Sequence, residues 1–428
     1  MSKVFRWVLI SIAAVVLVGA AAIWWNFRAG RVSVPPPPPS PSAVTQLPET
    51  SENVSAPSST TPPATPPPVT PPSTKVEPIV TLARNLEIPW GLDFLPDGSF
   101  GGVNTERSER AQDKSIIFTE RPGRIRLIDS NGALLTEPLL TVTDVAPRGE
   151  GGLLGIAVHP DFRENGFIYV YHTYQAQTGL ANRVVRYRLE GKNLLLNQVI
   201  LDGIPASNIH DGGRLKFGPD GMLYITAGDA SQPNLAQDKN SLAGKILRVK
   251  DDGSIPPDNP FPGSPVYSYG HRNPQGLAWD DRGRLWETEH GSSTRDELNL
   301  IVPGNNYGWP VIRGDETADG MVNPVLHSGD DTWAPSGLAF LPSASSGQAN
   351  GSLYFAGLRG LALYQAVIIG DKVELKTHLA KKFGRLREVV LGPDNLLYLF
   401  TNNRDGRGVP ADGDDLLLRV DPSQLEGR

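Results

Sequence analysis

An imidazole and a carboxylate at the ends of one predicted hairpin offer proton-transfer chemistry. His210 precedes one apolar strand candidate, and Asp229 follows the next strand candidate along the chain. A tight turn between the two strands returns both residues to the same end of the hairpin, where a carboxylate can orient an imidazole as a general base. A capped loop histidine beside a turn aspartate has the same spacing, and this alternative stays open.

Two further blocks carry arginines that suit an anionic small ligand. Arg272 lies just before an apolar strand candidate, in a polar block from 270 to 276, and its guanidinium offers a planar fork of donors. Arg385 and Arg387 alternate along another strand candidate, which places them on one face. The alternative is a surface strand with solvated arginines.

Acidic side chains in Gly-rich loops between residues 289 and 310 offer oxygen ligands for calcium. Glu289, Asp296 and Glu297 supply carboxylates, and the glycines leave main-chain carbonyls accessible. The spacing is not that of an EF-hand. A solvated acidic turn is therefore the alternative.

A recurring pattern shows which elements position these residues. An apolar pair, a Pro-Asp or related dipeptide, a Gly or Asn turn and an apolar-aromatic strand follow one another six times. The equivalent positions are 96, 160, 219, 280, 342 and 393, so the intervals run from 51 to 64 residues. Repeats of this size, with several short strand candidates each and no strong amphipathic helix pattern, predict an all-β six-bladed β-propeller.

The two ends of the repeat region favour a closed ring. Residues 80–83 and 416–420 both have strand-like patterns and can share one blade. Two stacked β-sandwiches are the alternative, which the regular spacing disfavours. The loops of a propeller converge at one mouth of its central channel, so polar residues that interrupt the apolar pattern there are candidate site residues.

The first 75 residues differ in composition from the repeat region. Residues 7–25 form an uncharged apolar run of 19 residues, long enough to span a bilayer as a helix. Residues 34–73 hold 15 prolines and 13 serines or threonines, which cannot bury enough apolar surface to order the chain. We expect an anchor in the cytoplasmic (inner) membrane at 1–31, a disordered linker at 32–75, and a periplasmic or otherwise extracytoplasmic propeller at 76–428. A cleaved signal peptide is the alternative to the anchor.

Composition excludes several classes of function. The 428 residues include no cysteine, so disulfides, thiol nucleophiles and Cys-ligated metal centres are absent. The formal net charge is −6, which does not favour nucleic acid as a partner. The glycines from 149 to 155 miss the spacing of a dinucleotide-binding fingerprint by one residue, and the sequence has neither a P-loop nor a Gly-x-Ser-x-Gly nucleophile motif.

Together these blocks resemble the quinoprotein glucose/sorbosone dehydrogenase family, whose members use pyrroloquinoline quinone (PQQ). The resemblance covers about residues 78–421 and rests on blocks in one order: 88–92, 119–125, 149–162, 210–229, 244–248, 270–277, 304–310 and 335–340. The family fold is a six-bladed propeller, in agreement with the repeats. The implied activity is PQQ-dependent oxidation of an aldose sugar at C1 to the lactone, with electrons passed to a respiratory acceptor.

The resemblance also implies a role for individual residues. His210 matches the general base that takes the proton from the sugar C1 hydroxyl as hydride passes to the quinone. Asp229 matches the carboxylate that orients this base, and Arg272 the cation beside the reactive quinone carbonyl. The other implied cofactor contacts are Glu150, Asn273, Gln275, Arg359, Arg385 and Arg387.

Calcium is the second implied cofactor, since it helps to neutralise the three carboxylates of PQQ. The resemblance implies that main-chain carbonyls of Gly291 and Ser292 hold the calcium that contacts the cofactor. Glu297 and Tyr307 match ligands of a separate structural calcium. The third side-chain ligand of that ion has two candidates, namely Asp315 and Glu316.

The sequence departs from the family pattern in places that bear on substrate and metal. Ser292 stands where the soluble glucose enzymes have proline, and Glu150 where glucose-oxidising relatives have an amide. An insertion at 101–114 interrupts the predicted first hairpin. Two other functions stay open: a non-catalytic calcium-bound propeller that binds a partner, and a calcium-dependent lactonase-type hydrolase with metal-bound water at the channel centre.

Overall fold

The computed structural model describes residues 77–96, 114–343, 349–370 and 372–425 of the chain. The predicted anchor at 1–31, the linker at 32–75 and the insertion at 101–114, apart from Lys114, lie outside the described residues. None of the helices among the described residues has the length and apolarity needed to cross a membrane.

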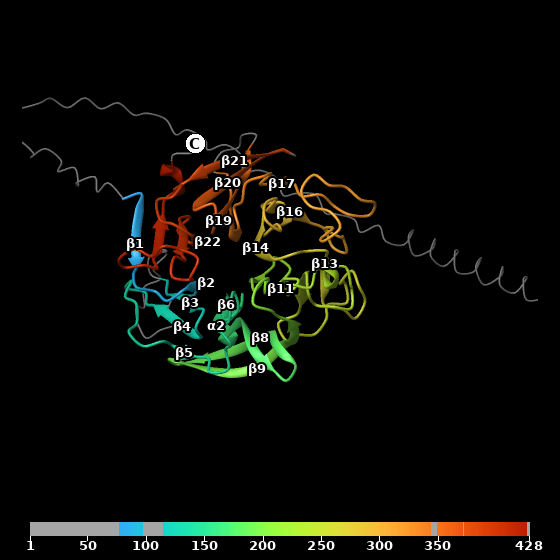
Figure 1. Cartoon of the computed structure of the whole chain (residues 1–428). Helices are drawn as coiled ribbons and strands as arrows, with labels where there is room; N and C mark the ends of the chain where they lie inside the picture. Colours follow the sequence, from blue (N-terminus) through green and yellow to red (C-terminus); the bar gives the residue numbers. More distant parts are fainter. Residues whose placement is uncertain (1–76, 97–113, 344–348, 371, 426–428) are drawn as a thin grey trace, which may run out of the picture. The chain divides into compact units, whose positions relative to one another are not determined.

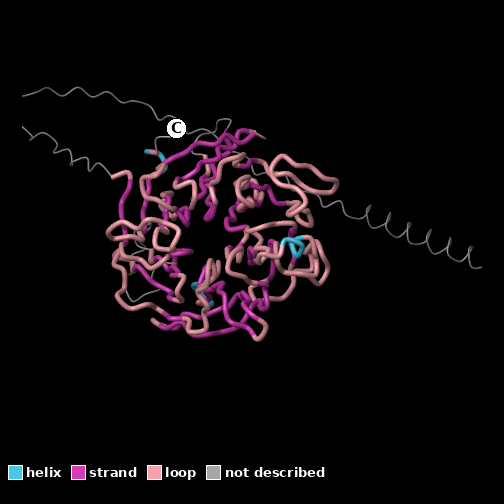
Figure 2. The backbone as a smooth tube through the Cα atoms, in the orientation of Figure 1, coloured by secondary structure: helices cyan, strands magenta, loops and turns pink. Residues whose placement is uncertain are grey.

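The described residues form six four-stranded antiparallel sheets, the blades of a propeller, arranged around one axis (Figures 1 and 2). The six-bladed all-β propeller predicted from the repeats is therefore confirmed. From the innermost strand outward, blades 1 to 3 consist of β2 (Pro89–Phe94), β3 (Ile116–Glu120), β4 (Arg124–Ile128) and β5 (Leu140–Thr141); β6 (Leu153–Val158), β7 (Phe167–Ala176), β8 (Gly179–Glu190) and β9 (Asn193–Pro205); and β10 (Leu215–Phe217), β11 (Leu223–Ala227), β12 (Lys245–Val249) and β13 (Val266–Tyr269).

Blades 4 to 6 continue around the axis in the same way. They consist of β14 (Pro274–Trp279), β15 (Leu285–Glu289), β16 (Glu297–Ile301) and β17 (Leu326–His327); β18 (Pro335–Leu341), β19 (Ala349–Gly357), β20 (Ala362–Ile369) and β21 (Lys372–His378); and β22 (Leu386–Leu391), β23 (Leu397–Thr401), β24 (Leu417–Val420) and β1 (Ile79–Ala83). The described helices are short and lie in connections: α2 (Phe162–Asn165), η2 (Pro233–Ala236) and η3 (Pro422–Gln424).

The ring closes within blade 6, which combines both ends of the described chain. β1 pairs antiparallel with β24, so that Ile79 lies opposite Val420 and Thr81 lies opposite Leu418. The shared blade predicted from residues 80–83 and 416–420 is therefore confirmed. This pairing ties the first strand of the ring to the last one.

The aspartate of the repeat fixes the first hairpin in several of the blades. In blade 3, Asp220 accepts a hydrogen bond from the Met222 amide at 3.1 Å and another from the Tyr224 hydroxyl at 2.9 Å. In blade 4, Asp280 likewise accepts from the indole of Trp286 at 2.9 Å. The turn aspartate and the aromatic residue of the following strand therefore fix each other, which accounts for their joint recurrence.

The starts of neighbouring innermost strands meet at one mouth of the ring. The Gly155 amide at β6 donates to the Gly213 carbonyl just before β10 at 3.0 Å. A Cβ atom on Gly155 would lie 2.2 Å from that carbonyl oxygen, so only glycine allows the contact. The glycine-rich block at 149–155 thus allows two neighbouring blades to come into contact. The residues that precede the innermost strands lie together at this mouth.

Candidate active site

His210 and Asp229 form a hydrogen-bonded pair at this mouth. His210 Nδ1 lies 2.7 Å from Asp229 Oδ1, and the aspartate is fully buried. Because a carboxylate accepts, Nδ1 carries the proton and Nε2 keeps its lone pair. Nε2 makes no hydrogen bond to the part of the chain that the structure describes. The structure therefore brings together the two predicted residues in the geometry of an oriented general base.

Neighbouring segments hold the main chain of His210 in an uncommon conformation. Its φ is 65°, in the left-handed region that residues with a Cβ atom rarely adopt. Its amide donates to Glu150 Oε2 at 2.9 Å, and its carbonyl accepts from the Ala230 amide at 3.2 Å. A Cβ atom on Gly228 would lie 2.0 Å from that carbonyl oxygen. The imidazole is therefore fixed through its backbone as well as through its ring.

Glu150 links His210 to a cation from blade 6. Its Oε1 accepts from Arg407 Nη1 at 2.8 Å, although the two residues are 257 positions apart. Burial alone would raise the pKa of the Glu150 carboxyl, but the charge of His290, the His210 amide and Arg407 together lower that pKa to about 2. Glu150 is therefore ionised at neutral pH. Sequence reasoning missed Arg407 because its loop carries no distinguishing motif.

Arg272 lies beside the loop that was predicted to hold calcium. Its Nη1 donates to the carbonyls of His290 at 3.2 Å and Gly291 at 2.6 Å, and its guanidinium lies 5.2 Å from the ring centre of Trp309. Burial lowers the pKa of this guanidinium, although Asp229 and other nearby carboxylates oppose the shift. Arg272 stays a cation, because the ordinary pKa of arginine is far above neutral pH.

Arg385 and Arg387 are both buried, which excludes the solvated surface strand. Arg387 Nη1 donates to Gln275 Oε1 at 2.8 Å, whereas Arg385 Nη2 pairs with Asp405 Oδ2 at 2.8 Å. A register shift between Leu386 and Glu388 interrupts the regular alternation that we expected for the two arginines. They share the mouth but have different partners. Burial, with the charge of Arg385 acting in the same direction, lowers the pKa of the Arg387 guanidinium to about 9.

The other predicted cofactor contacts differ in where the structure places them. Asn273 is fully buried, and its Oδ1 accepts from the Gly212 amide at 3.1 Å. Gln275 is buried too, with its side-chain oxygen committed to Arg387. Arg359 lies in the turn between β19 and β20 with an exposed side chain, and among the described residues only its main chain is bonded, to the Trp333 carbonyl.

Buried donors without partners test whether this mouth fits an anionic cofactor. Four such nitrogen atoms belong to residues of the mouth, namely Arg121 Nε, Arg272 Nε, Asn273 Nδ2 and Arg387 Nε, and a fifth, His290 Nε2, donates in one of the two imidazole tautomers. Buried donors normally have an acceptor. An excess of unused donors on cationic and amide side chains fits a ligand that carries several carboxylates, as PQQ does. Sequence reasoning missed Arg121, which lies in the block 119–125 that carried the resemblance, and His290, which lies in the 289–310 segment considered for calcium.

The predicted calcium loop fits a cation only in part. Gly291 O already accepts from Arg272 Nη1, and a second lone pair on that carbonyl is left for another ligand. The Gly291 amide donates to Asp296 Oδ1 at 2.8 Å, which holds the turn. Ser292 is exposed, and its hydroxyl accepts from Arg313 Nη1 at 3.2 Å.

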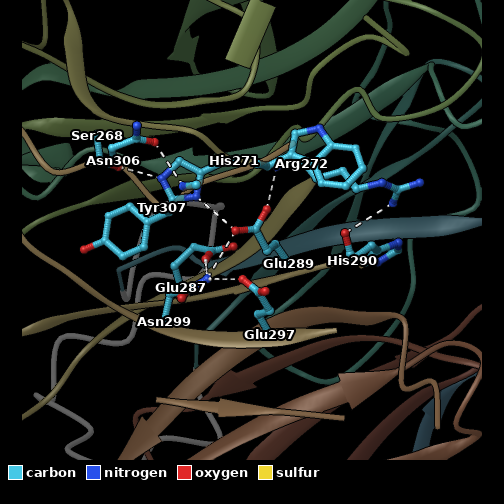
Figure 3. A network of polar contacts seen from close by, with 12 residues as sticks. Ser268, His271, Arg272, Glu287, Glu289, His290, Glu297, Asn299, Asn306 and Tyr307 are labelled. Carbon is cyan, nitrogen blue, oxygen red and sulfur yellow. Dashed lines mark hydrogen bonds and ion pairs between the residues drawn. The ribbon is translucent and has the colours of Figure 1, made fainter. Parts of the chain in front are cut away.

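A second cluster of carboxylates lies on β15 and β16 of blade 4 (Figure 3). Glu287, Glu289 and Glu297 all lie within 3.3 Å of Asn299 Nδ2, and His271 Nδ1 lies 3.1 Å from Glu289 Oε1. Burial raises the pKa of the Glu297 carboxyl to about 8, and the charge of Glu289 acts in the same direction. Glu287 and Glu289 follow the strand alternation of β15, a signal that sequence reasoning did not use.

This acid cluster fits a cation, because two of its buried acceptors have no partner among the described residues, namely Glu287 Oε1 and Asn299 Oδ1. The expected ligands are not all available there. The Tyr307 hydroxyl is already used within the fold, since it donates to the Leu300 carbonyl at 2.7 Å and accepts from the Val302 amide at 2.8 Å.

Neither candidate for the third calcium ligand joins the cluster in this structure. Asp315 is exposed and accepts from His327 Nε2 at 2.8 Å. Glu316 is exposed as well, and its carboxylate lies 3.4 Å from Arg313. Glu297 Oε1 instead accepts from the Gly314 amide at 2.9 Å.

Comparison with known sequences decides the family. The profile described as Glucose / Sorbosone dehydrogenase matches residues 86–418. The chain belongs to the glucose/sorbosone dehydrogenase family. The aldose sugar dehydrogenase YliI of Escherichia coli is 32% identical to it over 370 residues, which cover 80% of this chain and 92% of that protein.

Two further relatives of this glucose/sorbosone dehydrogenase agree with the assignment. The quinoprotein glucose dehydrogenase B of Acinetobacter calcoaceticus is 39% identical over 236 residues, which cover 47% of this chain and 49% of that protein. The solved PQQ-bound form of an aldose sugar dehydrogenase from Streptomyces coelicolor is 41% identical, with a TM-score of 0.70, and covers 82% of this chain and 97% of that chain. The matched range 86–418 contains all the mouth residues described above. The chain is thus an oxidoreductase of the sugar dehydrogenase type.

Proposed function

We propose that this protein oxidises an aldose sugar at C1 to the lactone with PQQ as cofactor. The observation that carries the proposal is the His210–Asp229 pair, set in a mouth with an excess of buried, unused donors. Two relatives support it by their names, because one is a quinoprotein glucose dehydrogenase and the other is an aldose sugar dehydrogenase with PQQ bound.

His210 Nε2 accepts the proton of the sugar C1 hydroxyl in this proposal. Asp229 holds the ring in the tautomer that leaves Nε2 free, and its charge stabilises the imidazolium that forms. When bound, PQQ supplies the quinone that accepts hydride. Arg272 provides a cation next to the His210–Asp229 pair, since the main-chain amide of Asp229 donates to the Arg272 carbonyl at 2.8 Å.

Three of the mouth residues with unused donors hold the cofactor in this proposal, namely Arg272, Asn273 and Arg387. Arg385 has its donors committed to Asp405 and to the carbonyls of Leu358 and Asn402. It supplies positive charge and positions the loop that carries Asp405. Arg359, whose exposed side chain lies in the turn between β19 and β20, adds a further cation.

Calcium has two places in the proposal. The Gly291 and Ser292 carbonyls offer hard oxygen ligands at the mouth, where a divalent ion offsets cofactor carboxylates. The acid cluster of Glu287, Glu289 and Glu297 offers a structural site in blade 4. Loss of the second ion is expected to lower stability before it lowers cofactor affinity.

Reconstitution tests the proposed function. Residues 74–428 are purified in EDTA, loaded with PQQ in the presence or absence of Ca²⁺, and assayed for dye reduction with a panel of aldoses. We expect activity only with PQQ and Ca²⁺ together. Tight calcium binding without PQQ binding would instead favour the non-catalytic propeller, and lactone hydrolysis without PQQ would favour the hydrolase.

The cellular setting completes the proposal. The uncharged apolar run at 7–25 supports an anchor in the cytoplasmic membrane, and in this proposal the propeller lies on the outer side of that membrane. Such a position suits a respiratory electron acceptor. Protease accessibility of the propeller in spheroplasts, compared with intact inverted vesicles, tests the orientation.

A further inference from the structure

Arg121 has no assigned role, yet the fold places its side chain at the mouth. It follows β3, and its backbone is pinned between two blades: its amide donates to the Ile88 carbonyl at 3.0 Å and its carbonyl accepts from the Leu153 amide at 2.9 Å. A Cβ atom on Gly152 would lie 2.5 Å from Arg121 Cγ. Glycine at 152 therefore makes room for the arginine side chain.

The guanidinium of Arg121 differs from those of its neighbours in the same blade. Arg124 and Arg126 both pair with Glu120, at 2.8 Å and 3.2 Å. Arg121 forms no side-chain hydrogen bond or ion pair with any described residue, and its Nε is buried without a partner. Burial lowers the pKa of this guanidinium. Arg121 is half-buried, and a donor such as its Nε that is shielded from water and left without an acceptor is unfavourable unless a ligand supplies one.

The carboxylates nearest to Arg121 are already used by other groups. Asp405 pairs with Arg385 at 2.8 Å, and Glu150 accepts from Arg407 and from the His210 amide. Their charges, together with that of Arg407, act on Arg121 without a hydrogen bond. Arg387 belongs to the same group, since the charge of Arg121 lowers its pKa. Four guanidinium groups therefore face two carboxylates in this part of the mouth.

We propose that Arg121 binds a carboxylate of the ligand that enters the mouth, through the paired donors of its guanidinium. The excess of two positive charges and the unused Nε fit an anion with two oxygens in one plane. The inference rests on the proposed function. The carboxylate belongs either to PQQ or to an acidic sugar such as a hexuronic acid, and the two sources are separable by experiment.

The variants Arg121→Gln and Arg121→Lys test the inference, with Arg148→Gln as the matched control. Arg148 lies in the same mouth loop as Glu150, and its side chain is exposed. PQQ is titrated into each apo-protein with Ca²⁺, and binding is followed by fluorescence. If the carboxylate belongs to PQQ, Arg121→Gln weakens binding about 10–100-fold, Arg121→Lys weakens it less, and Arg148→Gln leaves it within about twofold.

The second arm measures kcat/KM for glucose and for glucuronate in the loaded enzymes. If the carboxylate belongs to the substrate, PQQ affinity is unchanged and the glucuronate-to-glucose ratio falls about tenfold or more in Arg121→Gln alone. Unchanged PQQ affinity together with an unchanged ratio overturns the inference.

Stability separates a ligand role from a structural one. Arg121→Gln should melt at no lower temperature than wild type in the apo form, because it removes a half-buried charge that pairs with no described residue. A clear loss of apo stability would mean that Arg121 serves the fold, and would overturn the inference. Should wild type bind no PQQ at all, the proposed function fails, and thermal shift with glucuronate against glucose in wild type and Arg121→Gln still decides this inference.

Discussion

Trp309 donates its indole N–H to Asp229 Oδ2 at 2.8 Å, while the other oxygen of the same carboxylate faces the His210 ring. The aspartate is thus held from two sides. The Ser231 amide adds a third donor to Oδ1 at 2.8 Å. The Trp309 ring also lies next to the Arg272 guanidinium, so one residue contacts both the dyad and the mouth cation.

Trp309→Phe should reduce kcat about tenfold or more while PQQ affinity changes little. The variant keeps the ring beside Arg272 and removes one hydrogen bond to a charged acceptor, which contributes about 1.5–3 kcal/mol. Stopped-flow reduction of the bound cofactor measures the effect on the chemical step, and a change in the pH profile of kcat would show that the effect runs through the base.

Trp286→Phe is the matched control for this test. It removes the same kind of bond, from an indole to Asp280 at 2.9 Å, at a turn of blade 4. We expect lower stability with kcat intact. Equal losses of kcat in the two variants would mean that Trp309 acts through the fold rather than through Asp229.

His210→Gln should lower kcat by roughly 10²–10⁴-fold, the usual contribution of a general base. Glutamine keeps the polarity of the site but has no group that accepts the proton, so PQQ should still bind. The kcat of Asp229→Asn should fall by a similar factor, because the side-chain amide of asparagine can favour the wrong tautomer of the His210 imidazole. Near wild-type turnover in His210→Gln, measured with a saturating sugar, would remove His210 from the mechanism.

The sequence was sufficient to predict features that depend on local pattern. The turn aspartate and the aromatic residue after it recur together because the two bond within one hairpin, as Asp220 and Tyr224 do. The closing strand pair at Thr81 and Leu418 was predictable because both segments are strand-like and lie at the ends of the repeats. His210 and Asp229 were predictable for a similar reason, since one hairpin places both at the same end.

Contacts between blades were not predictable from the sequence. Glu150 and Arg407 come from blades 2 and 6, and nothing in either local segment points to the other. The bulge at Arg387 was also missed, because the shift depends on how β22 pairs with β23. The ligand set of the structural calcium stayed open for this reason too, since the position of Asp315 depends on a long loop that folds against His327.

Arg387→Gln should weaken PQQ binding more than Arg385→Gln does. Arg387 has an unused Nε at the mouth, whereas the donors of Arg385 are committed to Asp405 and main-chain carbonyls. We expect PQQ to bind about 10–100-fold more weakly to Arg387→Gln, which is the scale of one hydrogen bond to a charged group. The loss in Arg385→Gln should come through the unpaired Asp405, so the double variant with Asp405→Asn should recover affinity. Equal losses without recovery would contradict this division.

A chain that begins at Thr74 should fold, whereas one that begins at Arg84 should be much less stable. Residues from Thr74 onward form one compact unit, and the second chain lacks β1, which is the outer strand that closes blade 6 on β24. Loss of β1 exposes the edge of β24 and opens the ring. Chemical denaturation of both chains measures the difference, and equal midpoints would show that the ring does not depend on this strand pair.

Ionisation of Asp211 should make the apo-protein less stable as the pH rises from about 4 to about 7. Burial raises the pKa of this carboxyl from 3.8 to about 7, and its Oδ2 has no partner among the described residues. The folded state therefore holds a proton that the unfolded state releases, so stability is fully present below about 4 and is lost as the pH passes 7. The full change in the free energy of unfolding is on the order of 4 kcal/mol. Asp211→Asn keeps an oxygen for Ser207 and Asn182 and cannot ionise, so it should melt above wild type at pH 8.5 and close to it at pH 4. A melting difference that is the same at both pH values would show that Asp211 does not titrate in this range.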